Sequence, residues 1–124
     1  MHFDQRTQRA LREAGLDREA IAELSDRVAE LVDEDAERLE AFFAAHETVY
    51  SDMDLAHSRE RFPEHTVEYC DLFTHGADLR GYLRFDTWGV PVEGGRILGE
   101  ELVELTLGPT VGARVKFAPS RDAL

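Results

Sequence analysis

The chain has 124 residues, of which 43% are hydrophobic, and its 14 basic and 26 acidic residues give a formal net charge of −12. This composition supplies one ordinary core, so it excludes disorder of the whole chain. No apolar run approaches the roughly 18 residues that cross a membrane, and the first residues lack the basic start and apolar stretch of a secretory signal. We therefore expect one cytoplasmic domain over residues 1–124, with no membrane partner.

The acidic charge is combined with an unusual choice of basic residues, thirteen arginines and the one lysine Lys116. An acidic, lysine-poor composition is typical of a salt-rich cytoplasm, because at molar salt the Debye length is only about 3 Å and carboxylates repel one another weakly. The charge therefore predicts adaptation to the solvent, and the alternative is a surface that binds cations or a basic partner. Neither half of the chain clusters lysine and arginine, so the overall charge disfavours a nucleic-acid partner.

The composition changes near residue 62, because all four prolines and eight of the nine glycines follow it. The residues before it are rich in alanine, glutamate and leucine, and those after it in valine, threonine, glycine and aromatic residues. This order predicts a helical part over residues 1–62 and a sheet part over residues 63–118. The expected fold class is α+β, with two or three N-terminal helices packed on one face of a mostly antiparallel four-stranded sheet.

Local signals mark the ends of the first two helices. The first predicted helix spans residues 5–14, and Gly15 suits the left-handed position past its end. Asp17 is a good N-cap for a second helix over residues 18–46. The acidic run at residues 33–35 interrupts the apolar pattern of this helix, so we expect a bend or break there.

The second helix carries an apolar seam at steps of three and four residues. The seam either packs on the chain's own sheet or pairs with a second copy of the helix across a dimer. A third helix is expected over residues 52–61, with Ser51 as its cap. The seam residues are Ile21, Leu24, Val28, Leu31, Val32, Leu39, Phe42 and Phe43.

The second half of the chain predicts strands and turns. The last two strands must place inward residues opposite inward residues, which a connecting loop of three or five residues allows. The shorter loop places Glu104 opposite Arg114 and the longer one places it opposite Lys116, so either predicts an outer salt bridge. We favour the longer loop because Gly112 suits a left-handed backbone. The expected strands cover residues 66–74, 79–86, 101–107 and 111–117, with a turn at 75–78, a brief edge piece at 90–92 and a turn at 93–95.

Two segments and the composition resemble one family. The segments are residues 2–11, with the sequence HFDQRTQRAL, and residues 81–90, with the sequence GYLRFDTWGV. Together with the preference for arginine over lysine in an acidic chain, they resemble a small uncharacterised haloarchaeal family, a domain of unknown function. The resemblance implies a salt-rich archaeal cytoplasm, and it carries no catalytic residue over to this chain.

Histidine and cysteine residues gather in one part of the chain, at His57, His65, Cys70 and His75. Zinc requires ligands that converge, but an odd separation along a strand places Cys70 on the opposite face from His65 and His75 unless a bulge intervenes. We therefore predict no metal and no other cofactor. Acidic neighbours raise the pKa of the Cys70 thiol and no base adjoins it in the sequence, so we expect a structural cysteine rather than a nucleophile.

A group of basic and aromatic residues departs from the acidic background. Arg80, Tyr82 and Arg84 alternate outward along one strand, and we expect Arg114 and Lys116 on the same side of the sheet. Three interpretations remain open. These residues pair across strands with acidic neighbours, they dock a protein partner such as the acidic segment 33–40 of a second copy, or they bind single-stranded nucleic acid.

No set of residues forms a coherent catalytic group, so we favour a non-enzymatic function. The leading hypothesis is a small protein-interaction module that is adapted to high salt and binds a protein partner or itself, as a homodimer. The alternative is a small-molecule-binding protein or enzyme with a pocket between the long helix and the sheet. The lining residues expected for that pocket are Phe42, Phe43, Phe73, Phe85 and Trp88, with His46 or Asp71 as the polar group.

Overall fold

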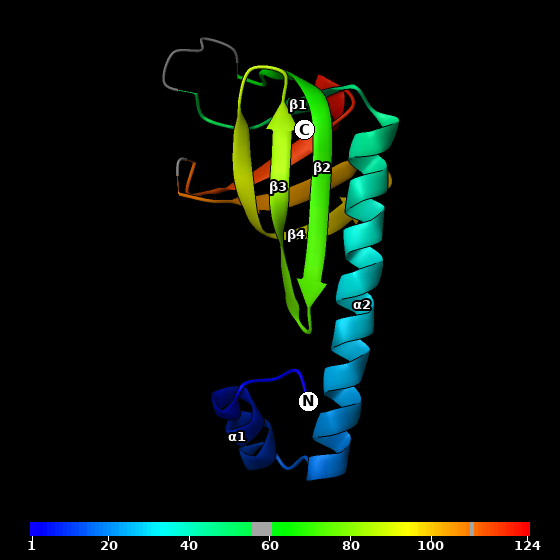
Figure 1. Cartoon of the computed structure of the whole chain (residues 1–124), viewed down its shortest axis with the longest axis vertical. Coiled ribbons are helices and arrows are strands. Elements are labelled where there is room, and N and C mark those ends of the chain that lie inside the picture. The colour runs from blue at the N-terminus through cyan, green and yellow to red at the C-terminus, as the bar shows by residue number, and fades with distance from the viewer. Residues whose placement is uncertain (56–60, 110) are drawn as a thin grey trace.

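The computed structural model describes residues 1–55, 61–109 and 111–124. Figure 1 shows that the strands gather at one end of the molecule, while α1 and the start of α2 project from the other. The predicted α+β class is confirmed. In chain order, the described elements are α1 (Gln5–Glu13), α2 (Arg18–Ala45), β1 (Thr48–Ser51), β2 (Glu64–His75), β3 (Asp78–Phe85), β4 (Gly89–Gly99), β5 (Leu102–Leu107), β6 (Arg114–Ala118) and the short 3-10 helix η1 (Arg121–Ala123).

The strands form one antiparallel sheet in the order β1-β2-β3-β4-β5-β6, which closes into a ring because β1 pairs with both β2 and β6. The predicted four strands are therefore too few. The prediction missed β1, and it divided β4 into an edge piece and a turn. Gly94 and Gly95 lie inside β4 instead, after an irregularity in the pairing between Val92 and Gly94.

The predicted joint between the first two helices is confirmed. Gly15 has a φ of 102°, and the N–H of Leu16 donates to the carbonyl oxygen of Leu11 at 3.1 Å, as a Schellman ending requires. Asp17 caps α2 by accepting a hydrogen bond from the N–H of Ala20 at 2.8 Å. The expected break at residues 33–35 is wrong, because α2 runs through them as one helix.

The segment that follows β1 differs from the predicted third helix. Residues 52–55 are not helical, and residues 56–60 of that helix lie outside the described residues. Ser51 ends β1 rather than capping a helix, and its Oγ accepts a hydrogen bond from the N–H of Met53 at 3.2 Å.

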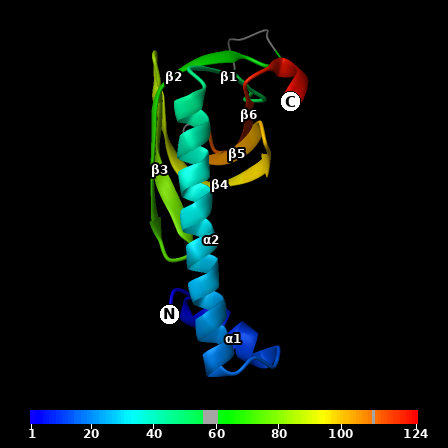
Figure 2. The same ribbon diagram turned by 90° about the vertical axis from the view of Figure 1, so that its right-hand side faces the viewer.

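α2 lies along the ring and contacts β2, β3 and β4. Figure 2 shows β2 and β3 on one side of this helix and β4 and β5 on the other. The C-terminal part of the apolar seam, which comprises Leu39, Phe42 and Phe43, is buried against the chain's own sheet. Leu24 and Leu31, in the projecting part, remain exposed. No helix within the described ranges is long and apolar enough to span a membrane.

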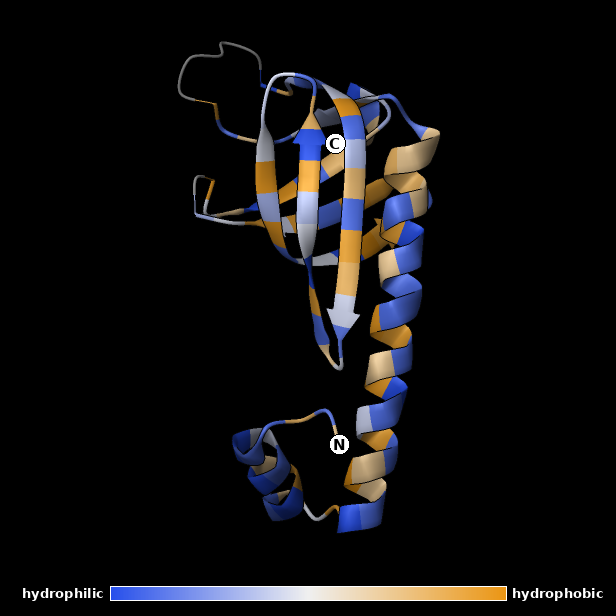
Figure 3. Cartoon of the chain, in the orientation of Figure 1, coloured by the Kyte–Doolittle hydropathy of each residue, from blue (hydrophilic) through white to orange (hydrophobic). Residues whose placement is uncertain are grey.

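The core fills the ring and the space between the ring and α2. Hydrophobic and hydrophilic residues alternate along much of β3 (Figure 3), and Leu79, Leu83 and Phe85 face inward as predicted. Glu104 lies opposite Lys116, and Gly112 has a φ of 62°, so the five-residue loop is confirmed. The ion pair of Glu104 nevertheless reaches Arg96 on its other neighbouring strand, at 2.9 Å.

Candidate functional site

The outer side of β2 and β3 carries a patch that we call the aromatic–arginine face. Pairing of the two strands places Tyr69 opposite Arg84, Asp71 opposite Tyr82 and Phe73 opposite Arg80. All of these side chains point outward because the residues that alternate with them, such as Cys70 and Leu83, are buried. The face consists of Glu68, Tyr69, Asp71, Phe73, Arg80, Tyr82 and Arg84.

Three aromatic side chains of this face are exposed to solvent. The exposed fraction is 63% for Phe73, 44% for Tyr69 and 37% for Tyr82. The rings of Tyr69 and Tyr82 lie 6.4 Å apart between centroids, within the range of an aromatic pair. A β-carbon at Gly89 would lie only 2.5 Å from the Tyr82 ring. Because glycine has no β-carbon, the ring can pack over Gly89 at the start of β4. The neighbouring backbone therefore restricts Tyr82 before any partner binds.

The arginines of the face are held by neighbouring groups. Nε of Arg84 lies 3.5 Å from a carboxylate oxygen of Glu68, so the predicted cross-strand pairing with an acid is present at this residue. The guanidinium of Arg80 donates to the carbonyl oxygens of Leu79 and Glu93. Because the face contains two arginines and two acids, its formal charges sum to zero in a chain of net charge −12.

The structure places the other two predicted basic residues elsewhere. Arg114 and Lys116 belong to β6, which lies three strands away from β3 in either direction around the ring. Both residues lie on the outer side of the sheet as expected, because they alternate with buried Val115 and Phe117. Ring closure nevertheless places β6 across the ring from β3, so they do not form one patch with Arg80. The backbone N–H of Lys116 donates to Asp52 Oδ1 at 2.8 Å, which ties β6 to the segment after β1.

The residues of the predicted pocket come together only in part, because Phe42, Phe43, Phe85 and Trp88 pack in one closed core whereas Phe73 does not join them. Phe42 is buried in the core, and its ring lies 5.1 Å from that of His46. Trp88 packs on the Phe85 ring at 5.1 Å. Asp71 and Phe73 point to the outer side of β2, since their positions alternate with buried Cys70. Strand alternation thus separates Phe73 from the aromatic residues of the core.

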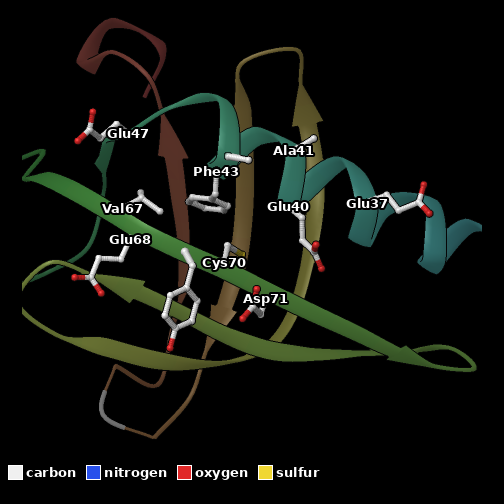
Figure 4. Close-up of a pocket in the computed structure, with 11 residues that line it drawn as sticks. Glu37, Glu40, Ala41, Phe43, Glu47, Val67, Glu68, Cys70 and Asp71 are labelled. Carbon is white, nitrogen blue, oxygen red and sulfur yellow. The ribbon is translucent and has the colours of Figure 1, made fainter.

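A groove of about 580 Å³ does lie between α2 and β2 (Figure 4), and of the predicted pocket residues Phe43 and Asp71 line it. It forms where β2 continues past its short pairing with β1 and presents a free edge, along which α2 runs. The N–H of Leu72 on this edge donates to Glu40 Oε1 at 2.8 Å, and the hydroxyl of Thr74 donates to Asp33. Eleven residues line the groove: Glu37, Glu40, Ala41, Phe43, Ala44, Glu47, Val67, Glu68, Tyr69, Cys70 and Asp71.

The lining of the groove is acidic around an apolar floor. Five of its residues are carboxylates from both walls, whereas Phe43, Val67 and Cys70 supply apolar surface. Burial, with the nearby charges of Glu40 and Asp71, raises the pKa of the Cys70 thiol to about 12. The thiol is therefore protonated at neutral pH and is not an activated nucleophile.

The histidine and cysteine residues are arranged differently from the prediction. The pairing of β2 shifts between Val67 and Tyr69, so His65 and Cys70 are both buried on the inner side, and their expected opposite placement is wrong. At about 3.3 Å per residue they lie roughly 16 Å apart along the strand, too far to share one ion. His75 is at the hairpin end of β2, and His57 lies outside the described residues. Across residues 1–55, 61–109 and 111–124, no group of three or more His, Cys, Asp or Glu could hold a metal ion.

A buried polar pair lies near the junction of β1 and β6. Ser51 Oγ is 2.7 Å from His65 Nε2, and the His65 ring stacks on Phe85 with 4.6 Å between centroids. Burial lowers the pKa of His65. Ser51 and His65 are 0% and 6% exposed, so the pair is closed to a substrate and stabilises the interior. Sequence reasoning missed this pair because it placed Ser51 at a helix cap.

The sequence analysis also missed that Tyr69 and Phe73 of β2 lie beside Arg84 and Arg80 of β3 on one face. The predicted turn at residues 75–78 contained the signal, because a tight hairpin there places Phe73 opposite Arg80 and Tyr69 opposite Arg84. The carboxylates of the groove had no comparable signal, since α2 and β2 meet only through the tertiary fold.

Comparison with known families assigns this chain to a family without assigning an activity. Residues 1–122 match the family described as Family of unknown function (DUF7532), and the chain belongs to this family. The predicted resemblance to a family of unknown function is thus confirmed at that level. No curated protein and no solved structure matched the chain.

Proposed function

We propose that this chain is a non-enzymatic protein-interaction module whose binding surface is the aromatic–arginine face. The observation that carries the proposal is the exposure of Tyr69, Phe73 and Tyr82 beside two arginines on regular strands. Tyrosine, phenylalanine and arginine are enriched at the centres of protein interfaces, where aromatic rings bury large areas with few rotatable bonds. Three such rings on one side of two paired strands therefore favour a docking surface.

The charges of the face favour a protein partner over a nucleic acid. Glu68 lies against Arg84, and Asp71 lies opposite Tyr82. Carboxylates among the arginines repel phosphate groups, and binding to a phosphate backbone requires net positive charge. A protein surface of mixed charge fits the face without this repulsion.

The remaining candidate chemistry supports a function without catalysis. The Cys70 thiol has a pKa of about 12, so it is a poor nucleophile at neutral pH. The hydrogen-bonded Ser51 and His65 are buried in the ring and out of reach of a substrate.

We also propose that the protein functions in a salt-rich archaeal cytoplasm. The net charge of −12 with a single lysine supports it, since acidic surfaces repel themselves strongly only at low salt. Thermal unfolding in increasing KCl tests this part. The midpoint is expected to rise by several degrees between 0.2 and 2 M KCl, and an unchanged or lower midpoint contradicts it.

Site-directed photo-crosslinking tests the binding face. The crosslinker benzoylphenylalanine replaces Phe73 in one variant and Leu98 in a control, because Leu98 is 37% exposed on β4, outside the face. In a lysate at molar KCl, one protein is expected to crosslink from position 73 and not from position 98. Unlabelled wild-type chain should compete for that protein, and a chain with Phe73→Ser and Tyr82→Ser should not. Equal crosslinking from both positions, or recovery of nucleic acid alone, contradicts the proposal.

The groove between α2 and β2 supports a second candidate function, the binding of a small organic cation. Its volume of about 580 Å³ lies within the range of small-molecule sites, and its carboxylates surround the apolar side chains of Phe43 and Val67. Titration of isotope-labelled chain with the diamine putrescine is expected to shift the amide signals of Ala41 and Cys70, whereas neutral butanediol is not. Equal responses to both compounds contradict this candidate.

A further inference from the structure

We infer that the partner of the aromatic–arginine face is a second copy of this chain. The inference rests on the proposed function of that face. The two copies meet face to face about a twofold axis that runs along the strands, between β2 and β3. Such an interface is isologous, so each copy presents the same residues to the other.

Charge complementarity is the first argument. Two chains of net charge −12 repel each other over most of their surfaces. On the aromatic–arginine face, Arg80 and Arg84 balance Glu68 and Asp71, so two copies approach there without net repulsion. Charges outside the contact are screened at molar salt, where the Debye length is about 3 Å.

The register of the strands selects the orientation of the two copies. Rotation about an axis along the strands places β2 of one copy over β3 of the other, so Tyr69 faces Arg84 and Phe73 faces Arg80 of the second copy. A guanidinium over an aromatic ring is a favourable cation–π contact. The same rotation places Asp71 between the two arginines of the second copy.

The alternative face-to-face orientation is unfavourable. A twofold axis across the strands would place Asp71 over Asp71 of the second copy and Arg80 over Arg84. Like charges would then meet at the centre of a desolvated contact, where they cost several kcal/mol. The charge pattern of the face therefore specifies one orientation of a symmetric dimer.

The fold directs association to this face rather than to the edge of β2. The ring closes through β1, and α2 covers the remaining free edge of β2, where Glu40 accepts the Leu72 N–H at 2.8 Å. Strand addition at this edge would require α2 to leave. Tyr82 is already restricted over Gly89, which lowers the entropy lost when the faces meet.

A charge exchange between two variants tests the inference. The acidic-face variant combines Arg80→Glu with Arg84→Glu, and the basic-face variant combines Glu68→Lys with Asp71→Lys. We expect the wild-type chain to sediment as a dimer in 2 M KCl, where contacts buried in the interface are screened little. Each variant alone should be a monomer, and an equimolar mixture should recover a dimer. Circular dichroism establishes that both variants are folded.

The control makes the same charge change outside the face. A chain with Arg114→Glu and Lys116→Glu carries its substitutions on β6 and should remain a dimer. As a second readout, Phe73→Ser should weaken dimerisation more than tenfold, because it removes an exposed ring without changing charge. A mixture that stays monomeric, or a control that dissociates as much as the acidic-face variant, overturns the inference.

The crosslinking experiment separates this inference from the proposed function. A wild-type chain that is monomeric up to millimolar concentration, with position 73 crosslinked to a different protein, overturns the homodimer and supports the interaction module. Crosslinking of position 73 to a second copy of the chain supports both. Crosslinking that does not depend on position contradicts the proposed function itself.

Discussion

Gly95 of β4 lies directly beneath Leu39 of α2, and a β-carbon at Gly95 would be 2.9 Å from Leu39 Cδ1. The same β-carbon would be 2.8 Å from Leu105 Cδ2 on β5. Both leucines are 0% exposed, so neither side chain can move into solvent. The glycine thus sets how closely α2 approaches the ring. α2 also supplies one wall of the groove between α2 and β2.

Gly95→Ala is expected to destabilise the fold by about 1–3 kcal/mol, because it overpacks this contact. Urea unfolding of the variant and the wild type measures the change. Gly94→Ala is the matched control, since its β-carbon would meet the Thr106 side chain at an ordinary 3.5 Å. Equal stabilities of the two variants would show that Gly95 does not limit the approach of α2.

Glu40→Ala should lower stability by about 1–2 kcal/mol, because the N–H of Leu72 loses its acceptor on the free edge of β2. Glu40→Gln keeps an amide oxygen there and should lose less. Amide hydrogen exchange at Leu72 is the direct measurement, and exchange should be faster in Glu40→Ala. Glu37→Ala, in the same groove, serves as the control. Unchanged exchange at Leu72 would contradict a role of Glu40 at this edge.

The features that the sequence predicted correctly depend on neighbouring residues. Gly15 and Asp17 determine the joint of α1 and α2 through hydrogen bonds within a few residues. The turns after β2 and β5 fix the register of their hairpins, which is why Glu104 was correctly placed opposite Lys116. Such signals act locally, so a single sequence contains them.

The features that were missed depend on distant residues. β1 is a strand because Tyr50 pairs with Glu64 on one side and with Ala118 on the other, and that second partner is far along the chain. Gly94 and Gly95 resemble a turn locally, but the requirement for space under Leu39 keeps them in a strand. Ring closure in turn separated Arg114 and Lys116 from the patch around Arg80, although all of them lie on the outer side of the sheet.

Cys70 should react slowly with thiol reagents in the folded chain. A pKa of about 12 in place of 9.0 lowers the thiolate fraction at pH 8 roughly 1,000-fold. The rate of reaction with a disulfide reagent should rise about tenfold for each pH step from 8 to 10, whereas a free thiol levels off near its ordinary pKa. Reaction in concentrated urea supplies the reference. A rate in the folded chain that levels off near pH 9 would contradict the raised pKa.

Burial of His65 should make the free energy of unfolding decrease as the pH falls. Burial lowers the pKa of this histidine below its ordinary value of 6.5, so the unfolded chain takes up a proton at a higher pH than the folded chain does. The contribution of His65 is therefore fully present above about pH 6.5 and is lost as the pH falls below that value. Urea unfolding between pH 5 and pH 8 should show a steeper fall for the wild type than for His65→Gln.

The test uses the difference in stability between the wild type and His65→Gln. Other groups that titrate in acid are the same in the two chains, so their effect cancels in this difference. Protonation of His65 would place a charge beside Phe85 and in the hydrogen bond with Ser51, so the loss should appear first as faster amide exchange in β1. If His65→Gln falls as steeply as the wild type, the titration of His65 is not the cause.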